Sequence, residues 1–256
     1  MELIPSVRNV VAKSKAVFAV VFALSGCGAG PTEPIIADYS ILFIGNSLTY
    51  TNDLPQTLER LLSYSDHGEV EVESIAHPNY GLEDHWYRGT AGESITKGNW
   101  DVVIMQQGPS ATEGRPSLLE YSQRFAELIK LGGATPAMFM IWPSASRRSD
   151  MFGVSDSYKT AAELTEGLLF PVGEAWTLIW ARDSSISLYG SDGFHPSKTG
   201  SYLAALVMYQ QLANRDPREL PADAAKINLP EEVVRLLQKA AFDANELHAR
   251  ILTSSS

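Results

Sequence analysis

Short apolar runs alternate with amphipathic segments along most of the chain. Four apolar runs with the length and composition of strands lie at 39–45, 100–105, 137–142 and 168–172. A fifth segment, 69–76, alternates polar and apolar residues, as an edge strand with one solvated face does. The amphipathic segments predict a helix that opens near residue 54 and further helices at 115–131, 157–167, 174–183, 196–212 and 230–252. Strands that alternate with helices of this length usually pair in parallel. The sequence therefore predicts an α/β fold, a three-layer α/β/α sandwich around a central, mainly parallel sheet.

The first 26 residues have the pattern of an export signal rather than of a folded element. Three basic side chains precede a short apolar run at 16–24, which is too short to span a bilayer comfortably. The segment LSGC at 24–27 resembles the lipobox of bacterial lipoproteins. That resemblance implies cleavage before Cys27 and attachment of a lipid to its thiol. An ordinary secretory signal, with Cys27 incidental, is the alternative.

Cysteine usage supports the lipid interpretation. Cys27 is the only cysteine, so no internal disulfide can form, and an odd thiol in an exported protein needs a role. We then expect residues 27–37 to be a flexible tether and residues 38–256 to form one folded domain that includes the final helix. The protein would be anchored to a membrane through Cys27. Because no aspartate follows that cysteine, the outer membrane is favoured if the source has two membranes.

The charge of the chain bears on its partners. The formal net charge is −10, and residues 1–26 carry three basic and one acidic side chain, so the processed chain would have −10 − 2 = −12. Affinity for nucleic acid depends on neutralising phosphates with basic side chains. A nucleic-acid partner is therefore not expected.

The first predicted strand ends in a Gly-Asn-Ser turn that contains Ser47. The strand carries the unbroken apolar run ILFI at 41–44, which is typical of burial on both faces. In α/β proteins, ligands bind outside the carboxyl ends of such strands, so Ser47 is a candidate reactive group. A simple turn is the alternative. We expect Asn52 or Asp53 to cap the next helix, which would leave Ser47 in a loop with its own N–H free.

A second candidate group lies far along the chain, in the segment SDGFHPS at 191–197. Asp192 precedes His195 by three residues across a glycine, and at this spacing the carboxylate can orient the imidazole ring. A serine nucleophile needs such a base, and the base needs such an orienting acid. Each residue alone has a plainer explanation, as a turn former or as a residue at a helix entry. Together with Ser47 they favour nucleophilic acyl transfer.

Two short blocks resemble the signature motifs of the SGNH (GDSL-like) hydrolase family. The block GNSLT at 45–49 is similar to the first family motif, with asparagine in place of the commoner aspartate, and DGFHP at 192–196 is similar to the last. They stand in the family's order and spacing. The resemblance implies the flavodoxin-like SGNH hydrolase fold and no cofactor. It also implies Ser47 as nucleophile, His195 as general base and Asp192 as the residue that orients the base.

The resemblance further implies where an oxyanion would bind. Family members use the backbone N–H of the nucleophile, here Ser47, the N–H of a glycine after the second strand, and an asparagine side chain after the third strand. Gly81 follows the second predicted strand, although it could be a plain strand-exit glycine. The third motif departs from the family pattern, since QQGPS stands at 106–110. A glutamine amide donates as asparagine does, so we expect Gln107, or else Gln106, to complete the oxyanion hole.

Other residues are weaker candidates. His85 could line the mouth of the site, but it lacks partners at ligand spacing, and no metal site is expected. Glu83 and Asp84 are adjacent, so their side chains diverge and do not make the separated acid pair of a glycosidase. Four aromatic side chains could stack on a sugar, although core packing is the favoured interpretation. They are Trp86, Tyr87, Trp142 and Tyr189.

These residues predict a serine esterase. Its predicted location outside the cytoplasm suggests an O-deacetylase that acts on an acetylated carbohydrate. A lipase or thioesterase remains open because nothing in the sequence fixes the acyl group, but the lack of a long apolar lid segment disfavours long-chain lipids. A catalytically silent, glycan-binding lipoprotein on the same fold also remains open, and the altered third motif is the feature that favours it.

Overall fold

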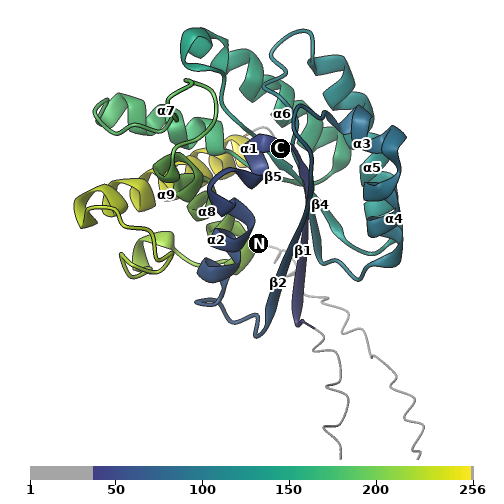
Figure 1. Ribbon diagram of the computed structural model, residues 1–256, viewed down its shortest axis with the longest axis horizontal. Coiled ribbons are helices and arrows are strands. Elements are labelled where there is room, and N and C mark those ends of the chain that lie inside the picture. Colours follow the sequence, from purple (N-terminus) through teal and green to yellow (C-terminus); the bar gives the residue numbers. More distant parts are fainter. Residues whose placement is uncertain (1–36, 255–256) are drawn as a thin grey trace, which may run out of the picture. The chain divides into compact units, whose positions relative to one another are not determined.

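A five-stranded sheet forms the centre of the region that the computed structural model describes, residues 37–254 (Figure 1). The strand order is β2-β1-β3-β4-β5, and each neighbouring pair is parallel. The strands are β1 (Tyr39–Gly45), β2 (Val70–Ala76), β3 (Val102–Met105), β4 (Thr135–Phe139) and β5 (Leu168–Phe170). The order places β1 between β2 and β3, which is the switch point where α/β folds bind ligands.

Helices cover both faces of this sheet, which confirms the predicted three-layer sandwich (Figure 1). One layer holds α2 (Leu54–Leu62), α7 (Val172–Arg182), α8 (Lys198–Ala213) and α9 (Glu231–Ser254). The other layer holds α3 (Leu82–Arg88), α4 (Thr90–Lys97), α5 (Arg115–Leu131) and α6 (Met151–Thr165). Short turns complete the described region, namely α1 (Ser47–Tyr50), η1 (Thr51–Asp53), η2 (Ala145–Asp150) and η3 (Pro217–Glu219).

The strand that leads to the serine turn is the most deeply buried part of the sheet. Ile41, Leu42, Phe43 and Ile44 are all 0 % exposed. Full burial of one such side chain stabilises a fold by about 1.5–3 kcal/mol, so the four contribute on the order of 6–12 kcal/mol as an upper estimate. The carboxyl end of β1 therefore has a firmly held platform.

The turn after β1 differs from the prediction. Ser47 opens α1 directly, and Asn46 is its N-cap, with Oδ1 accepting the Leu48 N–H at 3.0 Å. Asp53 occupies the predicted N-cap position of α2, but its side chain makes no capping hydrogen bond. Asn52 and Asp53 both have left-handed backbone (φ 59° and 55°). Asn and Asp tolerate this conformation better than other side chains, so the pair makes a kink between α1 and α2.

Some helices were not predicted, and other elements begin or end at different residues than predicted. The helices α3 and α4 were not predicted, because only Leu82, His85, Ala91 and Ile95 are buried along them and the apolar period is weak. The strand β4 begins two residues before the predicted start at 137 and ends at Phe139 rather than at 142, although residues 140–142 are still fully buried. The helix α6 begins at Met151 rather than at residue 157.

The predicted signal peptide at 1–26, the lipidation site Cys27 and the tether up to residue 36 lie outside the described residues. Within residues 37–254, none of the helices is both long and apolar enough to cross a bilayer.

Candidate active site

Ser47 lies at the carboxyl end of β1, at the first position of α1. Its backbone N–H has no hydrogen-bond acceptor among residues 37–254, as expected for the first residue of a helix. The next two side chains, Leu48 and Thr49, are buried and hold the turn down. Ser47 itself is only partly buried and lines a cavity.

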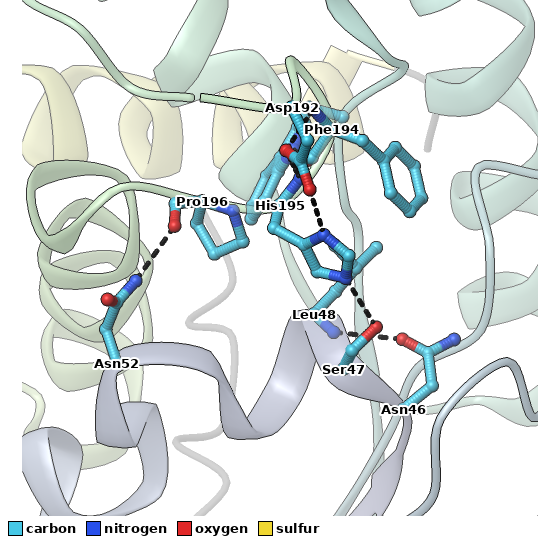
Figure 2. Close-up of polar contacts among 9 residues, drawn as sticks. Asn46, Ser47, Leu48, Asn52, Asp192, Phe194, His195 and Pro196 are labelled. Carbon is cyan, nitrogen blue, oxygen red and sulfur yellow. Dashed lines mark hydrogen bonds and ion pairs between the residues drawn. The ribbon is translucent and has the colours of Figure 1, made fainter. Parts of the chain in front are cut away.

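His195 and Asp192 complete a hydrogen-bonded chain with this serine (Figure 2). His195 Nε2 lies 2.9 Å from Ser47 Oγ, and His195 Nδ1 lies 2.5 Å from Asp192 Oδ2. The carboxylate can only accept, so Nδ1 carries the proton and Nε2 is the free base that faces the hydroxyl. This is the arrangement that a nucleophilic serine, a general base and an orienting acid require.

The loop that carries His195 is shaped by Asp192. The second carboxylate oxygen, Oδ1, accepts the N–H groups of Phe194 at 2.9 Å and of His195 at 3.0 Å. Gly193, which follows Asp192, has φ +69°, a conformation that glycine adopts without strain. The hydrogen bond from the His195 ring, followed by those from the backbone, lowers the pKa of Asp192 to about 2. Asp192 is therefore an ionised carboxylate in neutral solution.

Asn52 ties the serine segment to the histidine segment, a role that the sequence did not suggest (Figure 2). Its Nδ2 donates to the Pro196 carbonyl at 2.9 Å and to Ser201 Oγ at 3.0 Å. Ser201 Oγ in turn donates to the Thr51 carbonyl at 3.1 Å. The polar run Tyr-Thr-Asn-Asp after the serine turn was the available signal, but helix capping explained it equally well.

Gln106 holds the serine turn from below. Its Oε1 accepts the Asn46 N–H at 3.0 Å and the Thr49 hydroxyl at 2.8 Å, and the side chain is fully buried. Gly45 is required here, because a β-carbon at that position would lie 2.3 Å from Thr49 Oγ1 and 2.6 Å from Gln106 Oε1. Gln106 therefore positions the turn.

The predicted oxyanion donors are not all free in the structure. The Gly81 N–H donates to Asp84 Oδ2 at 2.8 Å. The Gln107 amide nitrogen donates to Ser110 Oγ at 2.9 Å and to the Gly114 carbonyl at 3.0 Å, so both of its N–H groups serve the loop that follows β3. Ser47 presents a free N–H, whereas the roles of Gly81 and Gln107 at an oxyanion stay predictions.

Gln107 has a second contact that links two walls of the site. Its Oε1 accepts the Leu82 N–H at 3.1 Å, and Asn46 Nδ2 donates to the Tyr80 carbonyl at 2.9 Å. The segment around Gly81 is thus held from both sides, by Gln107 and by Asn46.

A cavity of about 680 Å³ opens at Ser47. It lies between the residues that precede and open α3, the loop 107–114 and the segment 143–150. Its charged lining consists of one base, Arg147, and four acids, and Arg147 lies 2.6 Å from the carboxylate of one of them, Asp150. The other three acids are Glu83, Asp84 and Glu113. The walls therefore carry more negative than positive charge.

The weaker candidates, His85 and the aromatic side chains, lie mostly outside the cavity at Ser47. His85 does not line the mouth of the site, because it is fully buried under the serine turn. Trp142 and Tyr189 are core residues, as favoured, and Trp142 stacks on Trp176 with ring centroids 3.6 Å apart. Tyr87 is 72 % exposed and is not a core residue. Among residues 37–254, no three His, Cys, Asp or Glu side chains are placed to share a metal ion.

Comparison with known proteins adds structural relatives. No protein-family model and no curated protein matches the sequence. A candidate SGNH hydrolase from Slackia heliotrinireducens is similar in structure, with TM-score 0.60 and 27 % identity over 68 % of this chain and 98 % of that one. A DUF4886 family protein from Bacteroides uniformis has TM-score 0.65 and 18 % identity over 80 % of this chain and 94 % of that one.

An acetyl xylan esterase is also similar, with TM-score 0.53 and 13 % identity over 68 % of this chain and 99 % of that one. At this identity the likeness concerns the fold. Together these relatives confirm the resemblance that the two sequence blocks indicated, and the chain has the SGNH hydrolase fold.

Proposed function

We propose that the protein is a serine ester hydrolase that works through an acyl-enzyme. The observation that carries the proposal is the hydrogen-bonded chain from Asp192 through His195 to Ser47, with the free Ser47 N–H beside it. Ser47 lines a cavity large enough for an ester substrate. The Slackia relative is described as a candidate SGNH hydrolase, in agreement with the proposal.

The geometry supports a two-step reaction. Ser47 Oγ attacks the ester carbonyl carbon while its proton passes to His195 Nε2, which lies 2.9 Å away. The carbonyl oxygen becomes an oxyanion and accepts the Ser47 N–H. When the tetrahedral intermediate collapses, the alcohol leaves with the proton from His195. Water then attacks the acyl-enzyme by the same route and releases the acid.

The substrate that we propose is an acetylated, uncharged carbohydrate. The cavity carries carboxylates and hydroxyls that can bond sugar hydroxyls, and it also has the apolar surfaces of Pro109 and Phe194 for the faces of a sugar ring. Its negative balance disfavours an acidic sugar such as a sialic acid. The acetyl xylan esterase with this fold is consistent with the same class.

An aryl-acetate assay tests the reaction. We expect 4-nitrophenyl acetate to be hydrolysed by the purified protein and by Ser144→Ala, which removes another cavity hydroxyl, one that bonds Ser146 rather than His195. Ser47→Ala should lose at least about 10³-fold in kcat. Equal rates for the wild type and Ser47→Ala would reject the esterase and leave the silent glycan-binding protein as the account.

A substrate panel tests the specificity. Acetylated xylan should be a better substrate than an O-acetylated sialic acid or 4-nitrophenyl decanoate. A preference for decanoate would instead indicate the lipase or thioesterase alternative. A preference for the sialic acid would contradict the part of the proposal that depends on charge.

We also propose that the protein is exported and held at a membrane, the outer one where two exist, by a lipid on Cys27. The lipobox-like segment 24–27 and the single cysteine support this. Mass spectrometry of the native amino terminus should find diacylglycerol on Cys27. A free thiol in protein purified from its source would contradict the proposal.

A further inference from the structure

His85 lies on α3, directly beneath the serine turn, and is 0 % exposed. Its Nε2 lies 2.7 Å from the carbonyl oxygen of Gly45, two positions before Ser47. A carbonyl only accepts, so Nε2 carries the proton and Nδ1 is the bare nitrogen. Nδ1 has no partner within the described part of the chain, and burial lowers the pKa of the ring. His85 is therefore a neutral hydrogen-bond donor with one fixed tautomer.

The Gly45–Asn46 peptide group is held at both ends by this arrangement. At the carbonyl end, the oxygen accepts the His85 Nε2–H and, at 3.1 Å, the His77 N–H. At the amide end, the Asn46 N–H donates to Gln106 Oε1 at 3.0 Å. The C=O and N–H of a peptide group share one rigid plane, so contacts at both ends fix its rotation.

The orientation of this peptide group determines where Ser47 points. Rotation about the bonds of Asn46 would swing the Ser47 N–H and Oγ together, away from the oxyanion position and from His195. Gly45 has no side chain to restrict its own backbone, so the restriction must come from outside. A catalytic group displaced by about 1 Å can lose on the order of 10²-fold in rate.

We propose that His85 is a positioning residue for Ser47. Its Nε2–H holds the Gly45 carbonyl so that the serine N–H and hydroxyl keep their working directions. His85 does not line the cavity and touches no substrate, so it acts through the backbone alone. This inference rests on the proposed function, since it concerns the same serine.

Three substitutions at His85 separate the hydrogen bond from simple packing. His85→Gln places an amide N–H where Nε2 stands and keeps the donor. His85→Met fills a similar volume without a donor. His85→Asn keeps an amide but places it near the Nδ1 position, out of reach of the Gly45 carbonyl.

Steady-state kinetics on 4-nitrophenyl acetate give the first readout, with rates expressed per folded protein measured by circular dichroism. We expect His85→Met to lower kcat roughly 10- to 100-fold with KM within about twofold of the wild type. We expect His85→Gln to retain kcat within about threefold. Equal kcat in the Met and Gln variants would overturn the proposal, as would wild-type kcat in the Met variant. If the Met variant does not fold, the comparison between Asn and Gln decides in the same way.

The amide resonance of Ser47 gives a second readout that needs no activity. It should move in the Met or Asn variant and stay close to the wild-type position in the Gln variant. This pattern would support the positioning role of His85 even if the protein hydrolysed none of the esters, in which case the proposed function alone would fail. An unmoved resonance in all three variants would overturn the positioning role of His85 but would not contradict the proposed esterase function.

Discussion

The Nε2 atom of His195 lies 2.9 Å from Ser47 Oγ, although the two residues are 148 positions apart in the chain. One side-chain bridge fixes this distance at the level of the backbone, because Asn52 donates to the carbonyl of Pro196, the residue after the histidine. Asn52 also stands at the left-handed kink that follows α1. The same residue thus sets the direction of the serine segment and its distance from the base.

Substitution of Asn52 should lower both stability and rate. Asn52→Ala loses two hydrogen bonds and places alanine in a left-handed conformation, so the free energy of unfolding should fall by about 2–3 kcal/mol. Asn52→Gly loses the same bonds but tolerates the backbone, and its loss should be about 1 kcal/mol smaller. Both variants should lower kcat on 4-nitrophenyl acetate to a similar extent. Urea unfolding of the same variants gives their stability. Wild-type kcat in both variants would show that the Asn52 bridge does not position Ser47 and His195.

Asp192→Asn should reduce catalysis without disturbing the loop. The asparagine oxygen can still accept the N–H groups of Phe194 and His195, so the turn is retained. Its amide nitrogen would face Nδ1 and favour the wrong ring tautomer, in which Nε2 carries the proton. Loss of the orienting carboxylate should lower kcat by roughly 10²–10⁴-fold. A loss of less than tenfold in a variant with native circular dichroism would argue against the assigned role of Asp192.

Asp84→Asn should increase the rate. The Asp84 carboxylate accepts the Gly81 N–H at 2.8 Å, and the family resemblance assigns that N–H to the oxyanion. A negative charge at this position competes for the donor and opposes the developing charge, so its removal should raise kcat/KM by roughly three- to tenfold. Glu83→Gln is the matched control, because Glu83 lines the same cavity but accepts from Tyr121. A lower rate in Asp84→Asn would mean that the carboxylate supports Gly81 instead.

Acid should destabilise the protein partly through His85. Burial is the main cause that lowers its pKa, and His77 and Arg88 act in the same direction, whereas the hydrogen bond to the Gly45 carbonyl and the charge of Asp84 oppose it. The unfolded chain takes up a proton near the ordinary histidine pKa of about 6.5, whereas the folded chain takes it up only at a lower pH, so stability is lost as the pH falls below about 6.5. The effect of one such group is at most about 1.4 kcal/mol per pH unit.

Urea unfolding of the wild type and His85→Gln at pH 7.5 and 5.5 checks this expectation. The wild type should lose more free energy of unfolding over that interval than the variant. Equal losses in the two proteins would show that His85 does not contribute to the acid sensitivity.

The sequence was most informative where a pattern was long or rigid. The bounds of β1 and α5 were predicted in full, because a continuous apolar run and a 17-residue amphipathic period leave little ambiguity. Two sequence blocks far apart in the chain contain Ser47 and the pair Asp192 and His195, and the structure brings all three residues together. The distance between the blocks was no obstacle, because parallel strands deliver their carboxyl ends to one edge of the sheet.

The remaining features depend on contacts that local patterns do not encode. Asn52 fitted helix capping equally well, and only the position of Pro196 shows that its side chain is used elsewhere. The direction of the Gln107 amide depends on Ser110 and Gly114, in a loop whose path the sequence does not determine. The residues around His85 are mostly polar, as in a surface helix, so the sequence does not predict its burial. The burial follows from the packing of α3 against the serine turn.

Covalent trapping of the nucleophile tests the central claim most directly. An aryl fluorophosphonate should react with the folded protein at Ser47 Oγ, releasing fluoride, while His195→Ala should react far more slowly. Peptide mass spectrometry should then find one adduct, on Ser47, that rises in proportion to the loss of activity on 4-nitrophenyl acetate. An active protein that loses its activity through an adduct elsewhere, with Ser47 unmodified, would contradict the account.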